Sequence, residues 1–415
     1  MRKPSTLRRA GGVVLSGLLA MSWFSPMQQA LRSLPETLRL TQGEVSTLYL
    51  GGLSAKSDAL TVTATRDERL SPGGVELVAE TSGTAELLLS LFGVPVKRVE
   101  VEVSPQKRLI PGGQALGVAM RTDGVLVVGV SEVAEGVCPA QEGGIRAGDV
   151  ISTVNGVKIA TAQQLTEVVG QADGPLTVVY LREGRETKVQ LTPYRDESTG
   201  TARLGAWVRD STAGVGTLSF YDPDTGRYAA LGHAITDGDT GAVLSVSEGK
   251  VLRASIVAVQ KGKKGAPGEL KGSFLREAEV LGDIRRNTVL GIYGTLDAPA
   301  ANALYPDGLP IGLRDKVHTG KATILSSVDG TGVQEYAIEI IRVNPQSAPA
   351  PKSMVIRVTD ERLLAKTGGI VQGMSGSPII QDGKIVGAVT HVFVSDPTQG
   401  YGLYIDWMLQ ESGML

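Results

Sequence analysis

The chain has 415 residues, 42% hydrophobic and 4% aromatic, which is enough for two to four domains with real cores. A net charge of −2 gives no electrostatic footprint for nucleic acid or for an anionic membrane surface. The single cysteine, Cys138, excludes a disulfide framework within the chain and argues against a cysteine-based metal site. We expect Cys138 to be a small buried residue.

The N-terminus has the pattern of an export signal. Four basic residues precede an apolar stretch over 10–24, which is short for a bilayer-spanning helix and fits the h-region of a signal peptide. The small-residue cleavage pattern that follows, ending at Ala30, is poor. We therefore expect residues 1–30 to be a signal peptide or a membrane anchor.

Short apolar stretches separated by Gly, Pro, Ser and Asp follow over residues 31–105. Period-two alternation is clearest over 96–104, which is typical of a half-buried strand. This pattern predicts a small β-domain of the sandwich type, and none of its residues suggests chemistry.

The pattern changes over residues 106–193. Asn155-Gly156 predicts a tight turn between two strands. Thr161 and Gln164 have the spacing of a capping box, which predicts the start of a helix. A hairpin pattern ends the segment, so the pattern predicts a compact α+β domain.

This order of elements resembles a PDZ domain of the type attached to bacterial exported proteases. The residues that carry the resemblance are GIRAGDVI at 144–151 and VNG at 154–156. A PDZ domain implies the binding of an extended peptide or C-terminus by strand addition beside the helix. The resemblance places the carboxylate-binding loop near Leu116, Gly117 and Val118.

Residues 194–205 are polar and turn-rich, and we interpret them as a linker. The remaining residues, 206–415, are rich in β patterns and glycine and poor in helical periods. Their length suits a double β-barrel. The expected fold class is therefore mostly β.

The segment GMSGSP, 373–378, places Ser375 in a glycine-rich loop. The loop leads into a β-hairpin, because Asp382-Gly383 lies between two apolar runs. A tight turn is one interpretation of such a loop. The other is a nucleophile loop whose glycines let the N–H groups of Gly373 and Ser375 point at a developing oxyanion.

A serine nucleophile needs a base, and the chain has three histidines. His233 follows the end of an apolar strand, which predicts a position at the mouth of a loop. His391 falls inside an apolar strand, which favours a core or a pocket wall, and His318 lies in a polar turn. His233 is therefore the best candidate for the base.

Asp237 and Asp239 follow His233 in a DGDTG segment that has the look of an oxygen-ligand loop for Ca²⁺. The segment lacks the later ligands of an EF-hand, including the glutamate at position 12. The pattern favours a turn held by Asx hydrogen bonds. We expect neither a metal nor a cofactor.

The GMSGSP loop and its hairpin resemble the nucleophile loop of chymotrypsin-like serine proteases, with Ser377 where that family has glycine. The match becomes closer with GHAITDGDTG from Gly232, with GDIRRNTVLGIYG over 282–294 and with residues 373–405. Together these motifs resemble the stage IV sporulation protein B family, which are S55-type serine peptidases. The resemblance covers nearly all of the chain.

What the family implies is a trypsin-like serine endopeptidase (EC 3.4.21) that signals during endospore formation. Such a protein crosses the forespore membrane into the space facing the mother cell and stays close to the membrane. It cleaves itself near its N-terminus, and then cleaves a membrane-bound inhibitor of the intramembrane metalloprotease that processes pro-sigma-K.

The family's histidine and serine fall on His233 and Ser375, and its acidic residue falls on Asp360. Asp360 precedes Ser375 by only 15 residues, whereas the acid of chymotrypsin-like chains lies nearer the middle. Asp283, 50 residues after His233, fits that spacing better, so both acids remain candidates for orienting the histidine. By analogy, Thr390 and His391 would line the substrate pocket. A non-catalytic PDZ scaffold at the membrane surface is the alternative function.

Overall fold

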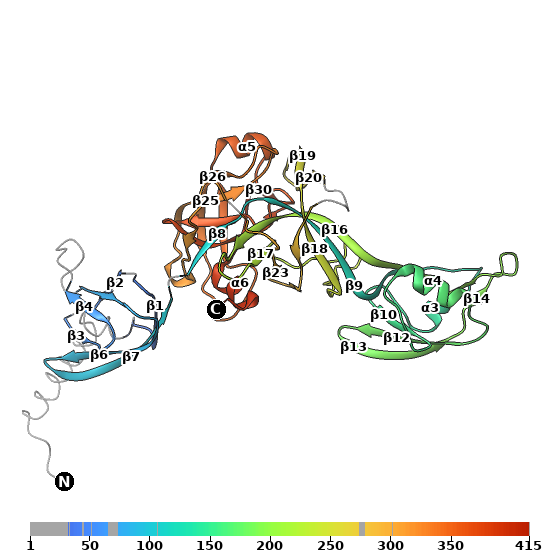
Figure 1. Cartoon of the computed structure of the whole chain (residues 1–415), viewed down its shortest axis with the longest axis horizontal. Coiled ribbons are helices and arrows are strands. Elements are labelled where there is room, and N and C mark those ends of the chain that lie inside the picture. The colour runs from blue at the N-terminus through green and yellow to red at the C-terminus, as the bar shows by residue number, and fades with distance from the viewer. Residues whose placement is uncertain are drawn as a thin grey trace, which may run out of the picture. The chain divides into compact units, whose positions relative to one another are not determined.

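The computed structural model describes residues 32–414, apart from 33, 44, 51, 65–73, 106, 274–278 and 301. The chain is mostly β and divides into two compact units, Met1–Lys107 and Arg108–Leu415 (Figure 1). The expected signal peptide or anchor, including residues 10–24, lies outside the described residues. Among the helices of the described part, none combines the length and the apolar character needed to cross a membrane.

The first unit contains two sheets around one core of leucine and valine side chains. The strong alternation at the end of the unit forms its longest strand, β7, in which every second residue from Val99 to Val103 is a buried valine. The first sheet has the order β1 (Thr37–Thr41), β7 (Val94–Ser104), β6 (Gly83–Leu91) and β3 (Ser54–Lys56). The second has the order β2 (Val45–Tyr49), β5 (Gly74–Val78) and β4 (Thr61–Ala64).

The region expected to be a PDZ domain has its own core within the second unit, and we keep that name for it below. The predicted turn at Asn155-Gly156 and the predicted helix start are confirmed, since the Thr161 hydroxyl accepts the N–H of Gln164 at 3.1 Å. The elements of the domain are α3 (Pro139–Glu142), β10 (Val150–Val154), β11 (Val157–Lys158), α4 (Ala162–Gly170), β12 (Leu176–Arg182), β13 (Arg185–Leu191), β14 (Tyr194–Arg195) and β15 (Ala202–Arg203).

Two long strands, β9 (Ala115–Val130) and β16 (Ala206–Tyr221), pair with each other and serve both the PDZ domain and the peptidase region (Figure 1). The first half of β9 also pairs with β18 (Glu248–Arg253), and its second half pairs with β10 of the PDZ domain. One continuous antiparallel ribbon therefore enters both cores.

This ribbon changes two expected boundaries. Residues expected to open the PDZ domain, 108–121, lie in β8 (Arg108–Pro111) and in the part of β9 that belongs to the peptidase sheet. Residues expected to be a linker, 194–205, complete the PDZ domain instead, because Ala202 and Leu204 are buried in its core. The linker pattern was misleading because only two of its residues are apolar and buried.

The first peptidase sheet surrounds a core that includes Leu116, Leu218 and Ile292. Its strands beyond β8, β9, β16 and β18 are β17 (Arg227–Ala230), β21 (Val280–Asp283), β22 (Arg286–Thr288), β23 (Gly291–Thr295) and β24 (Leu309–Pro310). A separate pair is formed by β19 (Ser255–Gln260) and β20 (Glu269–Ser273).

The last strands close into a six-stranded barrel, with the order β25 (Gly320–Ser326), β26 (Gln334–Val343), β27 (Met354–Val358), β30 (Asp396–Tyr404), β29 (Lys384–Phe393) and β28 (Pro378–Gln381). The short helices are η1 (Arg314–Lys316), α5 (Glu361–Thr367) and α6 (Ile405–Ser412). The predicted hairpin at Asp382-Gly383 joins β28 to β29. The prediction of a mostly β chain with β-barrel structure in its C-terminal region is confirmed.

Candidate active site

The loop that carries Ser375 lies between α5 and β28 and rests on strand β16. Thr217 of β16 donates its N–H to the Ser375 carbonyl at 3.0 Å and its hydroxyl to the Gly373 carbonyl at 2.7 Å. Gly376 has a φ of +98°, and a Cβ on it would lie 2.1 Å from the Thr217 carbonyl oxygen. Glycine is therefore required, because it lets the serine loop press against the first peptidase sheet.

The loop that carries His233 begins with a sharp turn at the end of β17. Leu231 and Gly232 both have a positive φ, and a Cβ on Gly232 would lie 3.0 Å from the side chain of Thr390. This turn brings the end of β17 against β29 of the closed barrel. The two segments that the sequence singled out, one from each peptidase subdomain, therefore meet.

Ser375 and His233 line one cleft of about 800 Å³, together with Gly373, Thr390 and His391. The ring centroids of His233 and His391 lie 5.2 Å apart, with the rings tilted by 42°. His391 thus lies on the pocket wall, where the strand pattern placed it. His318 lies elsewhere, with Nε2 2.8 Å from the Asp382 carboxylate.

The contacts of His233 select the tautomer that a general base needs. Its Nδ1 lies 2.8 Å from the Ala234 carbonyl oxygen, which can only accept, so Nδ1 carries the proton. The other nitrogen, Nε2, is then free of a proton in the neutral ring. Burial lowers the pKa of His233, opposed by the hydrogen bond to Ala234, so the neutral form dominates at neutral pH.

The second histidine of the cleft is also biased towards its neutral form. Burial, then the proximity of His233 and of Lys352, lowers the pKa of His391. The cleft therefore presents two uncharged imidazoles at neutral pH.

The serine is held by a hydrogen bond that must open before it can react. Its hydroxyl donates to the Thr390 carbonyl at 2.7 Å. The N–H groups of Gly373 and Ser375 donate to no acceptor among the described residues. Two backbone donors beside a hydroxyl are what an oxyanion hole requires.

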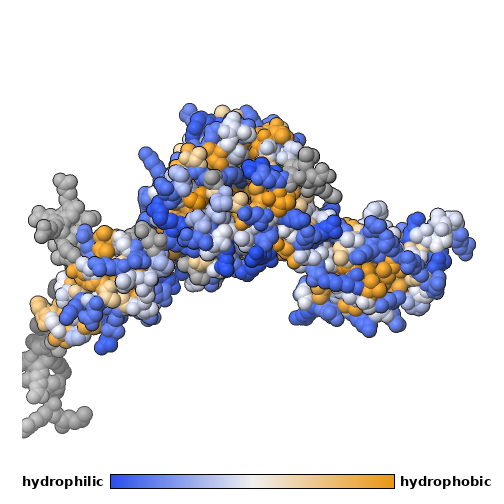
Figure 2. All heavy atoms as spheres, in the orientation of Figure 1, coloured by the Kyte–Doolittle hydropathy of each residue, from blue (hydrophilic) through white to orange (hydrophobic). Residues whose placement is uncertain are grey.

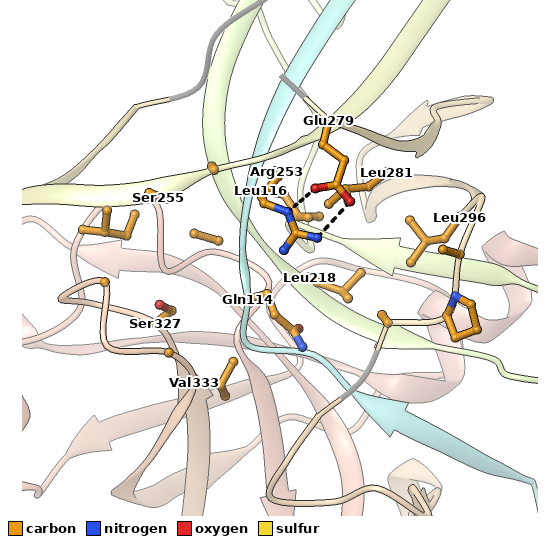
Figure 3. Close-up of a pocket in the computed structure, with 18 residues that line it drawn as sticks. Gln114, Leu116, Leu218, Arg253, Ser255, Glu279, Leu281, Leu296, Ser327 and Val333 are labelled. Atoms are coloured by element: carbon orange, nitrogen blue, oxygen red, sulfur yellow. Dashed lines mark hydrogen bonds and ion pairs between the residues drawn. The ribbon is translucent and has the colours of Figure 1, made fainter. Parts of the chain in front are cut away.

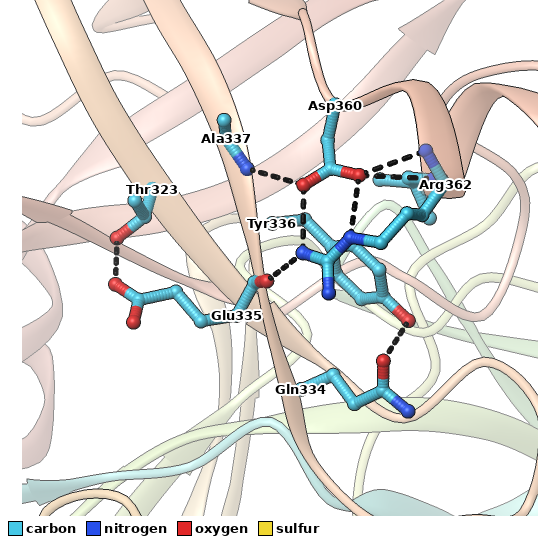
Figure 4. A network of polar contacts seen from close by, with 8 residues as sticks. Thr323, Gln334, Glu335, Tyr336, Ala337, Asp360 and Arg362 are labelled. Carbon is cyan, nitrogen blue, oxygen red and sulfur yellow. Dashed lines mark hydrogen bonds and ion pairs between the residues drawn. The ribbon is translucent and has the colours of Figure 1, made fainter.

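Asp360 does not reach His233. It caps the N-terminus of α5, accepting the N–H groups of Arg362 and Leu363 on one oxygen and the N–H of Ala337 on the other (Figure 4). The Arg362 guanidinium binds both oxygens, at 3.1 and 2.8 Å, and lowers the pKa of Asp360 to about 2. Both oxygens are therefore already bound, and the structure shows no contact through which Asp360 would orient His233.

Asp283, the other candidate acid, does not reach His233 either. One of its oxygens accepts the N–H of Thr295 at 2.6 Å, and the other accepts Nε of Arg285 at 2.7 Å. Its carboxylate thus ties β21 to β23. Among the described residues, no carboxylate hydrogen-bonds to His233, and the Ala234 carbonyl takes the place that an acid has in a triad.

The structure also corrects the carboxylate-binding loop of the PDZ domain. Leu116, Gly117 and Val118 lie inside β9, with β16 paired on one edge and β18 on the other. A peptide strand cannot add there, because both edges are occupied. Leu116 instead lines a cavity of about 430 Å³ in the peptidase region, near Leu218 and the ion pair of Arg253 with Glu279 (Figure 3).

A groove with the expected features lies between α4 and the segment 203–208. It has a volume of about 340 Å³ and is lined by Val133, Leu165, Val169, Leu204, Gly205 and Trp207. Figure 2 shows hydrophobic residues at the surface of the PDZ domain, at the right of the view. Ala206–Val208 pair with β9 on one edge, and no strand among the described residues pairs with the other. The free edge beside the helix suits an added peptide strand.

Sequence reasoning missed this groove although a signal was present. Leu204-Gly205 repeats the Leu116-Gly117 dipeptide, and each is followed by a small apolar residue and a strand pattern. The second copy lies after the PDZ pattern ends, inside the segment interpreted as a linker.

Comparisons with known proteins agree with this architecture. A family model described as SpoIVB peptidase S55 matches residues 200–409, half of the chain, and a PDZ domain model matches residues 106–181.

Several solved structures are similar to this chain. One is the PDZ domain of the SdrC-like protein from Listeria monocytogenes, with 19% identity, 21% of this chain and 87% of that chain covered, and a TM-score of 0.18. Another is the Rv3671c protease from M. tuberculosis in its active form, with 16% identity and a TM-score of 0.27. The match covers 49% of this chain and 74% of that chain. A third is the HtrA-type protease AlgW with a decapeptide, with 13% identity and a TM-score of 0.28. The match covers 52% of this chain and 57% of that chain.

The family match spans both the His233 loop and the Ser375 loop, and the PDZ match accounts for the domain that lies before them. The chain therefore belongs to the SpoIVB peptidase S55 family and is a serine endopeptidase with a PDZ domain.

Proposed function

We propose that this endopeptidase acts in sporulation signalling, by cleaving itself and then a membrane-bound inhibitor of the intramembrane protease that activates pro-sigma-K. The family membership and the match of the motifs around His233, over 282–294 and around Ser375 support this role. The export pattern over residues 1–30 supports a site of action between forespore and mother cell, with residues 10–24 as a membrane anchor or signal peptide.

The observation that carries the proposed mechanism is the shared cleft of Ser375 and His233. The Ser375 hydroxyl leaves the Thr390 carbonyl, attacks the peptide carbonyl carbon and passes its proton to Nε2 of His233. The N–H groups of Gly373 and Ser375 stabilise the oxyanion. The protonated His233 then protonates the leaving amine, and water hydrolyses the acyl-enzyme by the same steps in reverse order.

The PDZ groove gives the enzyme a second place to hold protein. An extended peptide added along Ala206–Val208 would dock a substrate or a partner, or the chain's own N-terminal segment, close to the membrane. Docking at the PDZ groove would raise the local concentration of the bound protein near the catalytic cleft.

The first test is self-cleavage. The wild-type chain and Ser375→Ala are expressed without residues 1–30 and followed by mass spectrometry over several hours. We expect only wild type to shorten. Equal shortening of both would assign the cleavage to host proteases and remove the support for self-processing.

The second test addresses the substrate. Wild type and Ser375→Ala are each co-expressed with the membrane-bound inhibitor, and the inhibitor is followed by immunoblot. We expect the inhibitor to be cut only with wild type. An intact inhibitor beside a self-cleaving enzyme would refute the proposed substrate while leaving the peptidase activity standing.

A further inference from the structure

Two neighbouring residues of β16 bind two different parts of the second unit. Arg209 binds the carboxylates of Asp237 and Asp239, with Nη2 2.8 Å from Asp239, in the loop that follows His233. Asp210 accepts the N–H of Ala162, the first residue of α4, at 2.9 Å. Two adjacent side chains of one strand therefore bind partners in two different domains. The dipeptide therefore joins the PDZ helix to the loop of the catalytic base.

The contact of Arg209 organises the His233 loop. The Asp237 side chain has no exposed surface, and its second oxygen accepts the N–H groups of Asp239 and Thr240 and the Thr240 hydroxyl. This Asx turn is the structure that the DGDTG pattern favoured. Without Arg209, the turn would enclose a buried carboxylate with no cation at the oxygen that Arg209 now binds, which is strongly destabilising.

The other side of the same loop is fixed by Asn287 of β22. Its Oδ1 accepts the N–H of Ile235, and its Nδ2 donates to the carbonyls of Ile235 and Leu244, each at 2.8 Å. Asn287 thus connects the His233 loop only to other parts of the peptidase region. Arg209 is the attachment that leads outside it, to the strand shared with the PDZ domain.

The strand that carries the dipeptide also reaches both cavities. Trp207 and Val208 line the PDZ groove with Leu165 and Val169 of α4, and Thr212–Val215 line the catalytic cleft. The pairing of β16 with β9 loses its regular register between Arg209 and Ser211. An interruption of this kind lets a strand bend locally and re-aims its side chains.

We propose that Arg209 and Asp210 are positioning residues that couple the α4 groove of the PDZ domain to the loop that holds His233. A shift of α4 when the groove is filled moves Asp210, and Arg209 then moves the turn at Asp237. The inference goes beyond the proposed sporulation role, because it requires only the peptidase activity and the groove.

The decisive variant is Ala162→Pro, which removes the N–H that Asp210 accepts. Proline is favoured at the first position of a helix. The preceding residue, Thr161, has φ −135° and ψ 153°, which is the extended conformation that a residue before proline adopts. The variant thus keeps the helix and deletes one hydrogen bond far from the cleft.

The readout is labelling of the full chain with a fluorophosphonate, in which Ser375 Oγ bonds to phosphorus, fluoride leaves and His233 takes the proton. We expect Ala162→Pro and Asp210→Ala each to lower the maximal labelling rate by at least about threefold, with the half-saturating probe concentration unchanged. The double variant should lose no more than either single one. Partial unfolding would reduce the labelled fraction and leave this rate unchanged.

Two substitutions of Arg209, one that removes the charge and one that keeps it, test its part in the coupling. Arg209→Gln should lower the maximal rate, and Arg209→Lys should restore part of it, since lysine keeps the charge without the forked geometry. A rate for Ala162→Pro equal to that of wild type would overturn the coupling. Losses that add in the Ala162→Pro, Asp210→Ala double variant would also overturn it, because the two residues would then act independently.

Discussion

At the scale of single residues, His233 has an unusual partner for a catalytic base. A backbone carbonyl, that of Ala234, receives its Nδ1 proton, where a triad has a carboxylate. The carbonyl fixes the tautomer as well as an acid does. It stabilises the imidazolium less, because it carries no full charge. The consequence is a base that stays neutral to lower pH.

This arrangement predicts the pH dependence of the enzyme. Burial lowers the pKa of His233 in the folded protein, so the ring loses its proton below the ordinary histidine value of about 6.5. We expect kcat/KM for a peptide substrate to be level through pH 7 and to fall only below about pH 6.5. An acid limb centred above pH 7 would contradict this, and would point to a carboxylate that raises the pKa of His233.

Asp360 makes a second prediction at the same scale. Asparagine caps helices about as well as aspartate, so Asp360→Asn keeps the α5 cap and loses the ion pair with Arg362. We expect a loss of about 0.5–1 kcal/mol in unfolding free energy and a kcat within about tenfold of wild type. Chemical denaturation and steady-state kinetics measure the two effects.

The control for that experiment is Asp360→Ala, which loses the cap as well and should cost about 1 kcal/mol more. If Asp360 were the triad acid, Asp360→Asn would lower kcat by about 10⁴-fold with little change in stability. Below about pH 4 the native stabilisation from Asp360 fades, because its folded pKa of about 2 lies under the unfolded value.

At the scale of elements, the PDZ groove depends on α4 and the start of β16. Trp207 is 65% exposed, and its Nε1–H donates to the Ser131 hydroxyl at 2.9 Å across the groove rim. We expect Trp207→Ala to weaken binding of a C-terminal peptide by about tenfold, since exposed aromatic anchors dominate such contacts. Calorimetric titration of a peptide selected from a C-terminal library measures the loss.

The matched control is Val157→Ala, which shortens an exposed apolar side chain of the same domain outside the groove. That variant should bind the peptide like wild type. Equal losses for Trp207→Ala and Val157→Ala would show that the peptide binds elsewhere on the PDZ domain.

At the scale of the whole molecule, the PDZ domain does not coincide with the segment 106–193 that the sequence pattern suggests. Its core includes Ala202 and Leu204, and α4 lies against β15, while the first half of β9 belongs to the peptidase. We expect a fragment 122–209 to unfold cooperatively on heating. A fragment 106–193 should be markedly less stable, because it lacks Ala202 and Leu204, and burial of the leucine side chain alone contributes about 1.5–3 kcal/mol.

Circular dichroism of the two fragments provides the measurement. A fragment 106–193 that melts as cooperatively and at the same temperature as 122–209 would refute the shared-strand boundary. The peptidase tolerates no such excision, because β9 and β16 form the centre of its first sheet.

Local sequence patterns were sufficient to predict several turns, one helix start and the two loops of the candidate site. Asp382-Gly383 and Asn155-Gly156 predicted their hairpins, and Thr161 predicted the start of α4, because turns and caps depend on residues within a few positions of one another. The rarity of histidine and the glycines around Ser375 narrowed the candidate site to two loops, which the structure places in one cleft.

Those local patterns could not predict which strands pair with each other across long sequence distances. Leu116-Gly117 and Leu204-Gly205 have the same local sequence, and only their pairing partners distinguish a barrel strand from a groove. Asp360 and Asp283 were both plausible acids from their spacing, and each carboxylate also binds a backbone N–H of another strand, that of Ala337 for Asp360 and that of Thr295 for Asp283. Which strand a residue meets is decided by the fold of distant segments, and so only the tertiary structure shows these contacts.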